Sequence, residues 1–114
     1  MASRAIQATR ITRRAYTLLA ALMLADGEWV TVRLLADGLF EHPVSPQAIR
    51  KHVWALQQFG IPQVVRCWRN GYSRGYRLAA LPADEHLALM LACVPAVKRS
   101  AWWQTRRSQI RMTA

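Results

Sequence analysis

Residues 45–59 constrain the fold more than any other segment, because they carry the start signal and the surface pattern of one amphipathic helix. Ser45 is a favoured N-cap residue, and Pro46 stands at the first helical position, where its missing N–H costs nothing. At about 100° per residue, polar and apolar side chains fall on opposite faces. The inner face holds Ile49, His52, Val53, Leu56 and Phe59, and the outer face holds Gln47, Arg50, Lys51, Trp54 and Gln58.

Charge is segregated along the chain in step with this pattern. Residues 26–41 contain four acids and only one base, Arg33, whereas residues 45–78 contain no acid and six bases: Arg50, Lys51, Arg66, Arg69, Arg74 and Arg77. The formal net charge of the chain is +10. This balance favours a polyanionic partner, with nucleic acid ahead of an anionic membrane.

The segments before residue 45 predict a helix, a short strand and a second helix. Apolar residues recur at helical spacing from Thr12 to Met23, and Asp26-Gly27 is a stop signal. Residues 28–30 are β-prone, and Thr31 is positioned to cap a helix over residues 32–40. That helix would offer the core Leu34, Leu35, Leu39 and Phe40.

The segments after Gly60 predict a hairpin and further helices. Residues 64–69 and 76–78 are strand-like, with Asn70-Gly71 as a tight turn. A turn centred on residues 73–75 is the alternative and leaves the register open. Acids at 84–85 suit the start of a helix whose stripe is Leu87, Met90, Leu91 and Val94, and Pro95 suits the start of a second helix.

The order of these elements predicts a mainly α fold with a small β hairpin. We expect a winged helix-turn-helix domain over residues 12–81, a basic arm over 1–11 and a basic helical extension over 82–114. Residues 48–56, followed by Phe59-Gly60-Ile61 and by residues 75–78, resemble the N-terminal winged-helix domain of biotin-ligase repressors. Residues 25–29 resemble the turn of that domain, and the similarity spans residues 16–81.

This resemblance implies binding to operator DNA as part of a dimer, without biotin chemistry, because the ligase domain is absent. Two features depart from the family pattern. The connection before the third helix is longer and contains Pro43, and the hairpin gains residues near its tip. The relative angle of the second and third helices is therefore open.

The outer face of the third helix provides the candidate base-reading residues. Gln pairs with adenine and Arg or Lys with guanine, while a helix N-terminus attracts phosphate. The candidates are Ser45, Gln47, Arg50, Lys51 and Trp54. A solvated polar face is the alternative interpretation. Trp54 either packs on a sugar or thymine methyl group or closes against the C-terminal segment.

Two further groups of basic residues are candidates for contact with the DNA backbone. On the hairpin these are Arg66, Arg69, Asn70, Arg74 and Arg77, which suit phosphates or a narrow minor groove. Their alternative role is to protect an exposed strand edge from aggregation. On the arms they are Arg10, Arg13, Arg14, Arg106 and Arg107.

The segment from residue 84 onward leaves three interpretations open. It forms a homodimer through residues 84–103, or a phosphate-binding arm that includes Trp102 and Trp103, or a helix on an anionic membrane surface. No apolar run is long enough to span a bilayer, and residues 18–25 make a poor signal peptide. We therefore expect a cytoplasmic, nucleoid-associated protein.

No motif for catalysis, metal binding or a cofactor is present. His42 and His86 are isolated in the sequence and do not have the spacing of metal ligands. We expect His52 in the core, and we expect Cys67 and Cys93 to be buried thiols. The sequence thus predicts a non-enzymatic, sequence-specific regulator of transcription that binds double-stranded DNA, typical of a phage or mobile-element repressor. The alternatives are an architectural or excision factor, and a protein-interaction module that inhibits a host nucleic-acid enzyme.

Overall fold

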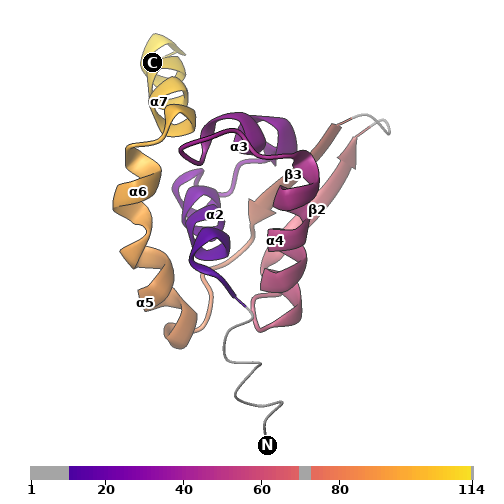
Figure 1. Cartoon of the computed structure of the whole chain (residues 1–114). Helices are drawn as coiled ribbons and strands as arrows, with labels where there is room; N and C mark the ends of the chain where they lie inside the picture. The colour runs from indigo at the N-terminus through magenta and orange to yellow at the C-terminus, as the bar shows by residue number, and fades with distance from the viewer. Residues whose placement is uncertain (1–10, 70–72, 114) are drawn as a thin grey trace, which may run out of the picture.

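A computed structural model describes residues 11–69 and 73–113. Its central element is α2 (Arg13–Leu24), which begins at Thr12, whose hydroxyl accepts a hydrogen bond of 3.2 Å from the Ala15 amide. All eight residues from Ala15 to Leu22 are buried. The predicted stripe is thus wider than one helix face, because α2 is covered on several sides (Figure 1).

The chain reverses after α2 and enters a short strand and a second helix. Asp26 and Gly27 both have positive φ, 55° and 81°, which explains why the predicted stop falls there. Strand β1 (Val30–Thr31) leads into α3 (Val32–Gly38), and the Thr31 hydroxyl accepts from the Leu34 amide as predicted. Helix α3 ends before Phe40, earlier than predicted. Leu34 is 56% exposed, so the prediction that Leu34 belongs to the core was wrong.

The predicted third helix is present as α4 (Pro46–Gln58). The Ser45 hydroxyl accepts a hydrogen bond of 3.1 Å from the Ala48 amide, and Pro46 occupies the first turn. Ile49, Val53 and Leu56 are buried. The helix ends ahead of Gly60, whose φ of 117° suits glycine and confirms the expected stop.

A small antiparallel sheet follows α4. Strands β2 (Val64–Arg69) and β3 (Ser73–Leu78) pair with each other, and β1 joins the other side of β3, giving the order β1-β3-β2. Arg69 lies opposite Ser73, and Gly75 pairs with both Cys67 and Thr31. Gly75 is therefore inside a strand, which excludes the turn centred on residues 73–75.

The C-terminal segment forms three consecutive helices: α5 (Asp84–Ala92), α6 (Val94–Lys98) and α7 (Ala101–Thr113). We had expected a single helix after Pro95. The break near Ser100 instead divides this segment, and the Ser100 hydroxyl accepts a hydrogen bond of 3.1 Å from the Trp103 amide. Leu91, predicted in the apolar stripe of α5, is 48% exposed, whereas Met90 is fully buried.

Helices α5 and α6 cover one side of α2, α4 lies on its other side, and α7 packs against α3 (Figure 1). Tyr16 on α2 and His86 on α5 are joined by a hydrogen bond of 2.8 Å between Oη and Nδ1. Burial, together with the Glu85 and Cys93 charges, raises the pKa of Tyr16. Met90, Cys93, Val97 and Trp102 belong to the same core as α2 and α4. In the part of the chain described, no helix combines the length and hydrophobicity needed to cross a membrane.

Candidate nucleic-acid interface

An open groove runs between the outer side of α4 and the sheet. It has a volume of about 270 Å³, and none of the described residues lining it is acidic. We name it the helix–strand groove; it is lined by Gln47, Arg50, Lys51, Val53, Trp54, Gln57, Arg66 and Tyr76. Four of the five residues predicted on the third helix therefore share one surface with Arg66 of the predicted hairpin.

The start of α4 sets the geometry at one end of this groove. Ser45, the remaining predicted residue, caps the helix and fixes where its first turn begins. Arg50 donates a hydrogen bond of 3.2 Å from Nη2 to Oε1 of Gln47. A guanidinium has five N–H donors, so this contact orients Arg50 while leaving it capacity for an acceptor outside the protein.

The opposite wall of the groove is held by strand pairing and by one side chain of α4. Arg66 on β2 lies opposite Tyr76 on β3, and Tyr76 is buried at 2% exposure. Gln57 donates a hydrogen bond of 2.9 Å from Nε2 to the backbone carbonyl of Val64. This bond fixes the end of α4 to the start of β2, and so fixes the distance between the two walls.

Trp54 is the most exposed large apolar side chain of the groove, at 58%. Its ring meets that of Phe59 edge to face, with centroids 6.1 Å apart and an interplanar angle of 89°. A tryptophan exposed beside Arg50 and Lys51 offers an apolar face to a ligand that is otherwise bound by charge. Of the two alternatives for Trp54, this position favours contact with such a ligand.

A second basic position lies where α2 approaches α4. The Arg14 guanidinium carbon stands 5.6 Å from the centre of the Phe40 ring, and Phe40 contacts His52 with centroids 6.2 Å apart. His52 is half-buried. Its burial, and secondarily the charge of Arg14, lower the pKa of His52 below its ordinary value. The shift favours the neutral imidazole, but His52 is not part of the buried core in which the sequence analysis placed it.

Two predicted residues lie away from the helix–strand groove. The guanidinium carbon of Arg77 lies 5.0 Å from the centre of the Trp29 ring. In the sheet, Arg77 is opposite Val65, one position away from Arg66. Arg106 donates from Nη2 to the Glu28 carboxylate at 2.6 Å and to the Ala25 carbonyl at 3.2 Å. This ion pair neutralises Arg106 within the molecule.

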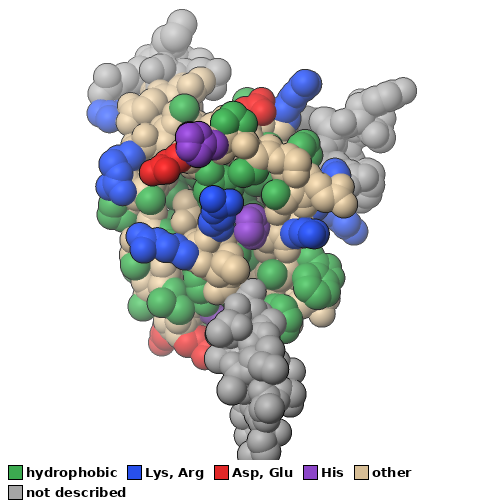
Figure 2. Space-filling view, viewed as in Figure 1, with side chains coloured by type: hydrophobic (Ala, Val, Ile, Leu, Met, Phe, Trp, Pro, Cys, Tyr) green, Lys and Arg blue, Asp and Glu red, His purple; other side chains and the backbone are tan. Residues whose placement is uncertain are grey.

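The remaining candidates are distributed over the surface or fall outside the described part. Arg13 and Arg107 are exposed, on α2 and α7 respectively. Arg10 and Asn70 lie outside the described residues, as do the side chains of Arg69 and Arg74, whose backbones form part of β2 and β3. Figure 2 shows Lys and Arg side chains across one face, over α2, α4 and the C-terminal helices.

Sequence reasoning missed two residues of the groove, Gln57 and Tyr76. Gln57 is three positions after Trp54 and seven after Arg50, a spacing that places it near the same face. The sequence pattern placed Gln58, not Gln57, on the outer face, and neither residue was a candidate for base reading. The position of Tyr76 opposite Arg66 had no equivalent signal, because it depends on strand register.

The described part of the chain gathers no cluster of three or more His, Cys, Asp or Glu suited to a metal ion. Cys93 is buried as a free thiol, as expected. Comparisons with protein families, with curated proteins and with solved structures find no match to this chain. Its function is therefore inferred from the geometry and chemistry of the helix–strand groove.

Proposed function

We propose that this protein is a winged helix-turn-helix regulator of transcription that binds double-stranded DNA in a sequence-specific manner. The observation that carries the proposal is the helix–strand groove, where hydrogen-bonding and cationic side chains of α4 face Arg66 and no acid is among the described lining residues. An α-helix fits the major groove of B-DNA, and phosphate contacts from a neighbouring element fix its position.

In this proposal α4 enters the major groove with its N-terminal half leading. Gln47 and Arg50 lie in that half and are joined by a hydrogen bond, so they would meet the bases as a pair. Gln suits adenine and Arg suits guanine. Lys51 and the capped N-terminus at Ser45 then meet phosphates on the groove edge.

The hairpin of β2 and β3 would serve as the wing. Arg66 lies on the sheet wall of the helix–strand groove. With α4 in the major groove, we expect it to meet the sugar–phosphate strand at the groove edge. The Gln57–Val64 hydrogen bond keeps this wall at a fixed distance from α4. A preset spacing lowers the entropic cost of binding DNA.

We further propose that the protein acts as a homodimer through residues 84–103 and represses by occupying a promoter. Leu89 and Leu91 on α5 are 52% and 48% exposed, beside the buried Met90. At about 100° per residue the two leucines lie about 200° apart, on the two flanks of Met90, so each is a separate apolar position at which a second copy would dock. Sedimentation of Leu89→Glu against the unmodified protein tests this: the variant is expected to be monomeric, and equal masses would refute the interface.

The decisive experiment for DNA binding is selection of bound fragments from a random duplex library, with affinities then measured at two salt concentrations. A regulator of the proposed kind enriches a short motif, and a dimer enriches it as two inverted half-sites. Binding without enrichment would replace sequence-specific regulation with an architectural role. Absence of binding at moderate salt would refute the proposal and direct attention to an acidic protein partner.

A further inference from the structure

A pair of basic side chains lies on the flank of α4 that faces away from the helix–strand groove. At about 100° per residue, His52 is about 200° around the helix from Arg50, with Lys51 midway between them on the outer face. The half-buried His52 ring contacts Phe40, with centroids 6.2 Å apart. The guanidinium carbon of Arg14, on α2, lies 5.6 Å from the centre of the same Phe40 ring. Arg14 and His52 therefore share one aromatic ring beside α4.

The positive charge of Arg14 is not balanced by any described residue. Neither Arg14 nor His52 forms an ion pair or a side-chain hydrogen bond within the described part of the chain. Glu41, which follows Phe40 in the sequence, is exposed and pairs with neither of them. Because Arg14 is also exposed, its guanidinium N–H donors are available to an acceptor outside the protein.

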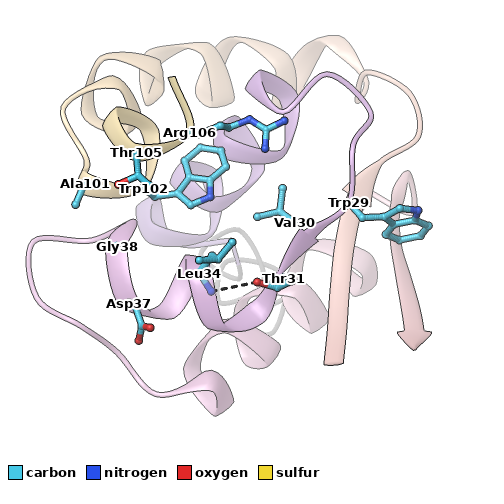
Figure 3. Close-up of a pocket in the computed structure, with 10 residues that line it drawn as sticks. All are labelled: Trp29, Val30, Thr31, Leu34, Asp37, Gly38, Ala101, Trp102, Thr105 and Arg106. Atoms are coloured by element: carbon cyan, nitrogen blue, oxygen red, sulfur yellow. Dashed lines mark hydrogen bonds between the residues drawn. The ribbon is translucent and has the colours of Figure 1, made fainter. Parts of the chain in front are cut away.

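Arg106 shows how a similar arrangement is completed elsewhere in this protein. Its guanidinium carbon lies 5.7 Å from the centre of the Trp102 ring, and Figure 3 shows the two side chains next to each other. There the Glu28 carboxylate accepts a hydrogen bond of 2.6 Å from Arg106 and supplies the negative charge. Arg14 lies over Phe40 at nearly the same distance, but no described carboxylate pairs with it. An anion from outside the protein would take the place that Glu28 has beside Arg106.

His52 can add a second positive charge at this position. Burial first, and the charge of Arg14 second, lower the pKa of His52, so the free protein favours the neutral imidazole. Among the described residues of α3 and β2, the other elements packed against α4, no charge contributes to this shift. A phosphate next to both side chains would offset the Arg14 charge and stabilise the imidazolium, because an opposite charge within about 4–6 Å favours the charged form. Phosphate binding and protonation of His52 would then be coupled.

We propose that Arg14 and His52 together bind one backbone phosphate of DNA, and that His52 takes up a proton from solution when this phosphate binds. The inference rests on the proposed function, since it takes α4 to lie in the major groove. A sugar–phosphate strand borders each side of that groove, and phosphate contacts fix the orientation of the protein on the duplex. Arg66 meets the strand on one side of α4, and Arg14 with His52 meets the strand on the other. Contacts with both strands set the rotation of α4, and so decide which of its side chains reach the bases.

Titration of the His52 imidazole by NMR tests the site in the unmodified protein, with and without a saturating random-sequence duplex of about two helical turns. We expect the pKa of His52 to be higher by about 1 in the complex. By linkage, the affinity for the duplex then increases about tenfold as the pH is lowered from above the pKa of the complex to below that of the free protein. A pKa that is unchanged or lower in the complex would overturn the proposal, irrespective of how any variant folds.

Two variants with matched controls assign the effect to this site. His52→Gln cannot take up the proton, so the increase in affinity at low pH should be lost, whereas His42→Gln, at an exposed position, should keep it. Arg14→Ala should weaken duplex binding and reduce the difference between the two pKa values of His52. Arg33→Ala, which removes another exposed charge, should leave both nearly unchanged.

The same titrations separate failure of this site from failure of DNA binding as a whole. No duplex binding at either end of the pH range would refute the proposed function and this site with it. Duplex binding whose pH dependence is the same in His52→Gln as in the unmodified protein would refute the site alone.

Discussion

Gln57 and Val64 are joined by a hydrogen bond of 2.9 Å between the side-chain amide and a backbone carbonyl. The bond crosses the connection in which Gly60 and Pro62 end α4 and begin the sheet. It therefore links the two walls of the helix–strand groove at the point where they diverge. It acts together with the backbone hydrogen bond of 2.9 Å from the Ile61 amide to the Leu56 carbonyl, which spans the same connection.

Replacing Gln57 by Leu is expected to lower the free energy of unfolding by about 0.5–1.5 kcal/mol, the usual net value of one hydrogen bond. DNA affinity should fall as well, since the sheet wall loses its fixed distance from α4. Urea denaturation and a binding titration measure the two effects. Gln58→Leu, at the neighbouring exposed position, is the control and should leave both unchanged.

Substitutions at Ser45 test the stability of α4 and its contact with DNA separately. Ser45→Ala removes the cap to the Ala48 amide and should cost about 0.5–2 kcal/mol of stability. Ser45→Asp keeps a capping oxygen and so keeps stability, but its charge should repel phosphate and weaken DNA binding. Ser45→Asn, which caps without charge, is the control and should preserve both properties. Equal DNA affinity for the Asp and Asn variants would remove Ser45 from the interface.

Arg50 is expected to read sequence. Arg50→Ala should weaken binding to the selected site by about 1–3 kcal/mol and relax the preference at one base pair. Binding to random DNA should change much less. Arg33→Ala, which removes an exposed charge outside both the groove and the proposed dimer segment, serves as the control for net charge. A loss that is the same for selected and random DNA would show that Arg50 contacts the backbone alone.

Arg66 is expected to contact phosphate. Arg66→Ala should weaken binding to all sequences by a similar factor and reduce the slope of log affinity against log salt by about one. Titrations at several salt concentrations give this slope. An unchanged slope, with the Arg33→Ala control behaving like the unmodified protein, would place the sugar–phosphate strand elsewhere.

His52 should make stability depend on pH. Its pKa lies below the ordinary value of 6.5, because of burial first and the charge of Arg14 second. Below pH 6.5 the unfolded chain therefore binds more protons at this site than the folded protein does, so the free energy of unfolding decreases as pH falls, until the folded-state pKa is passed. His52→Gln should flatten this decrease in denaturation measured at pH 7.5 and below. His42→Gln, at an exposed position, should not.

Local signals in the sequence predicted most of the fold. The two predicted caps, Thr31 and Ser45, act through their own side chains on amides three residues ahead, so tertiary contacts are not needed to identify them. The structure adds a third cap of the same kind at Thr12. The stop at Asp26-Gly27 and the one at Gly60 follow from the same short-range preference for positive φ. Side-chain exposure was less predictable: Leu34 and Leu91 follow a helical stripe but are not covered.

The candidate sites show the same division between local and long-range information. Helical periodicity by itself determined which side chains α4 turns away from the core, because a helix repeats its geometry without reference to the rest of the chain. Only the tertiary structure decided that Arg66 faces them and Arg77 does not, since this depends on the register of β2 with β3. It also decided that Arg106 pairs with Glu28, a residue 78 positions away, instead of remaining a free cation. The sequence alone does not distinguish these arginines from one another. Packing between distant segments decides which of them face the groove and which form ion pairs within the protein.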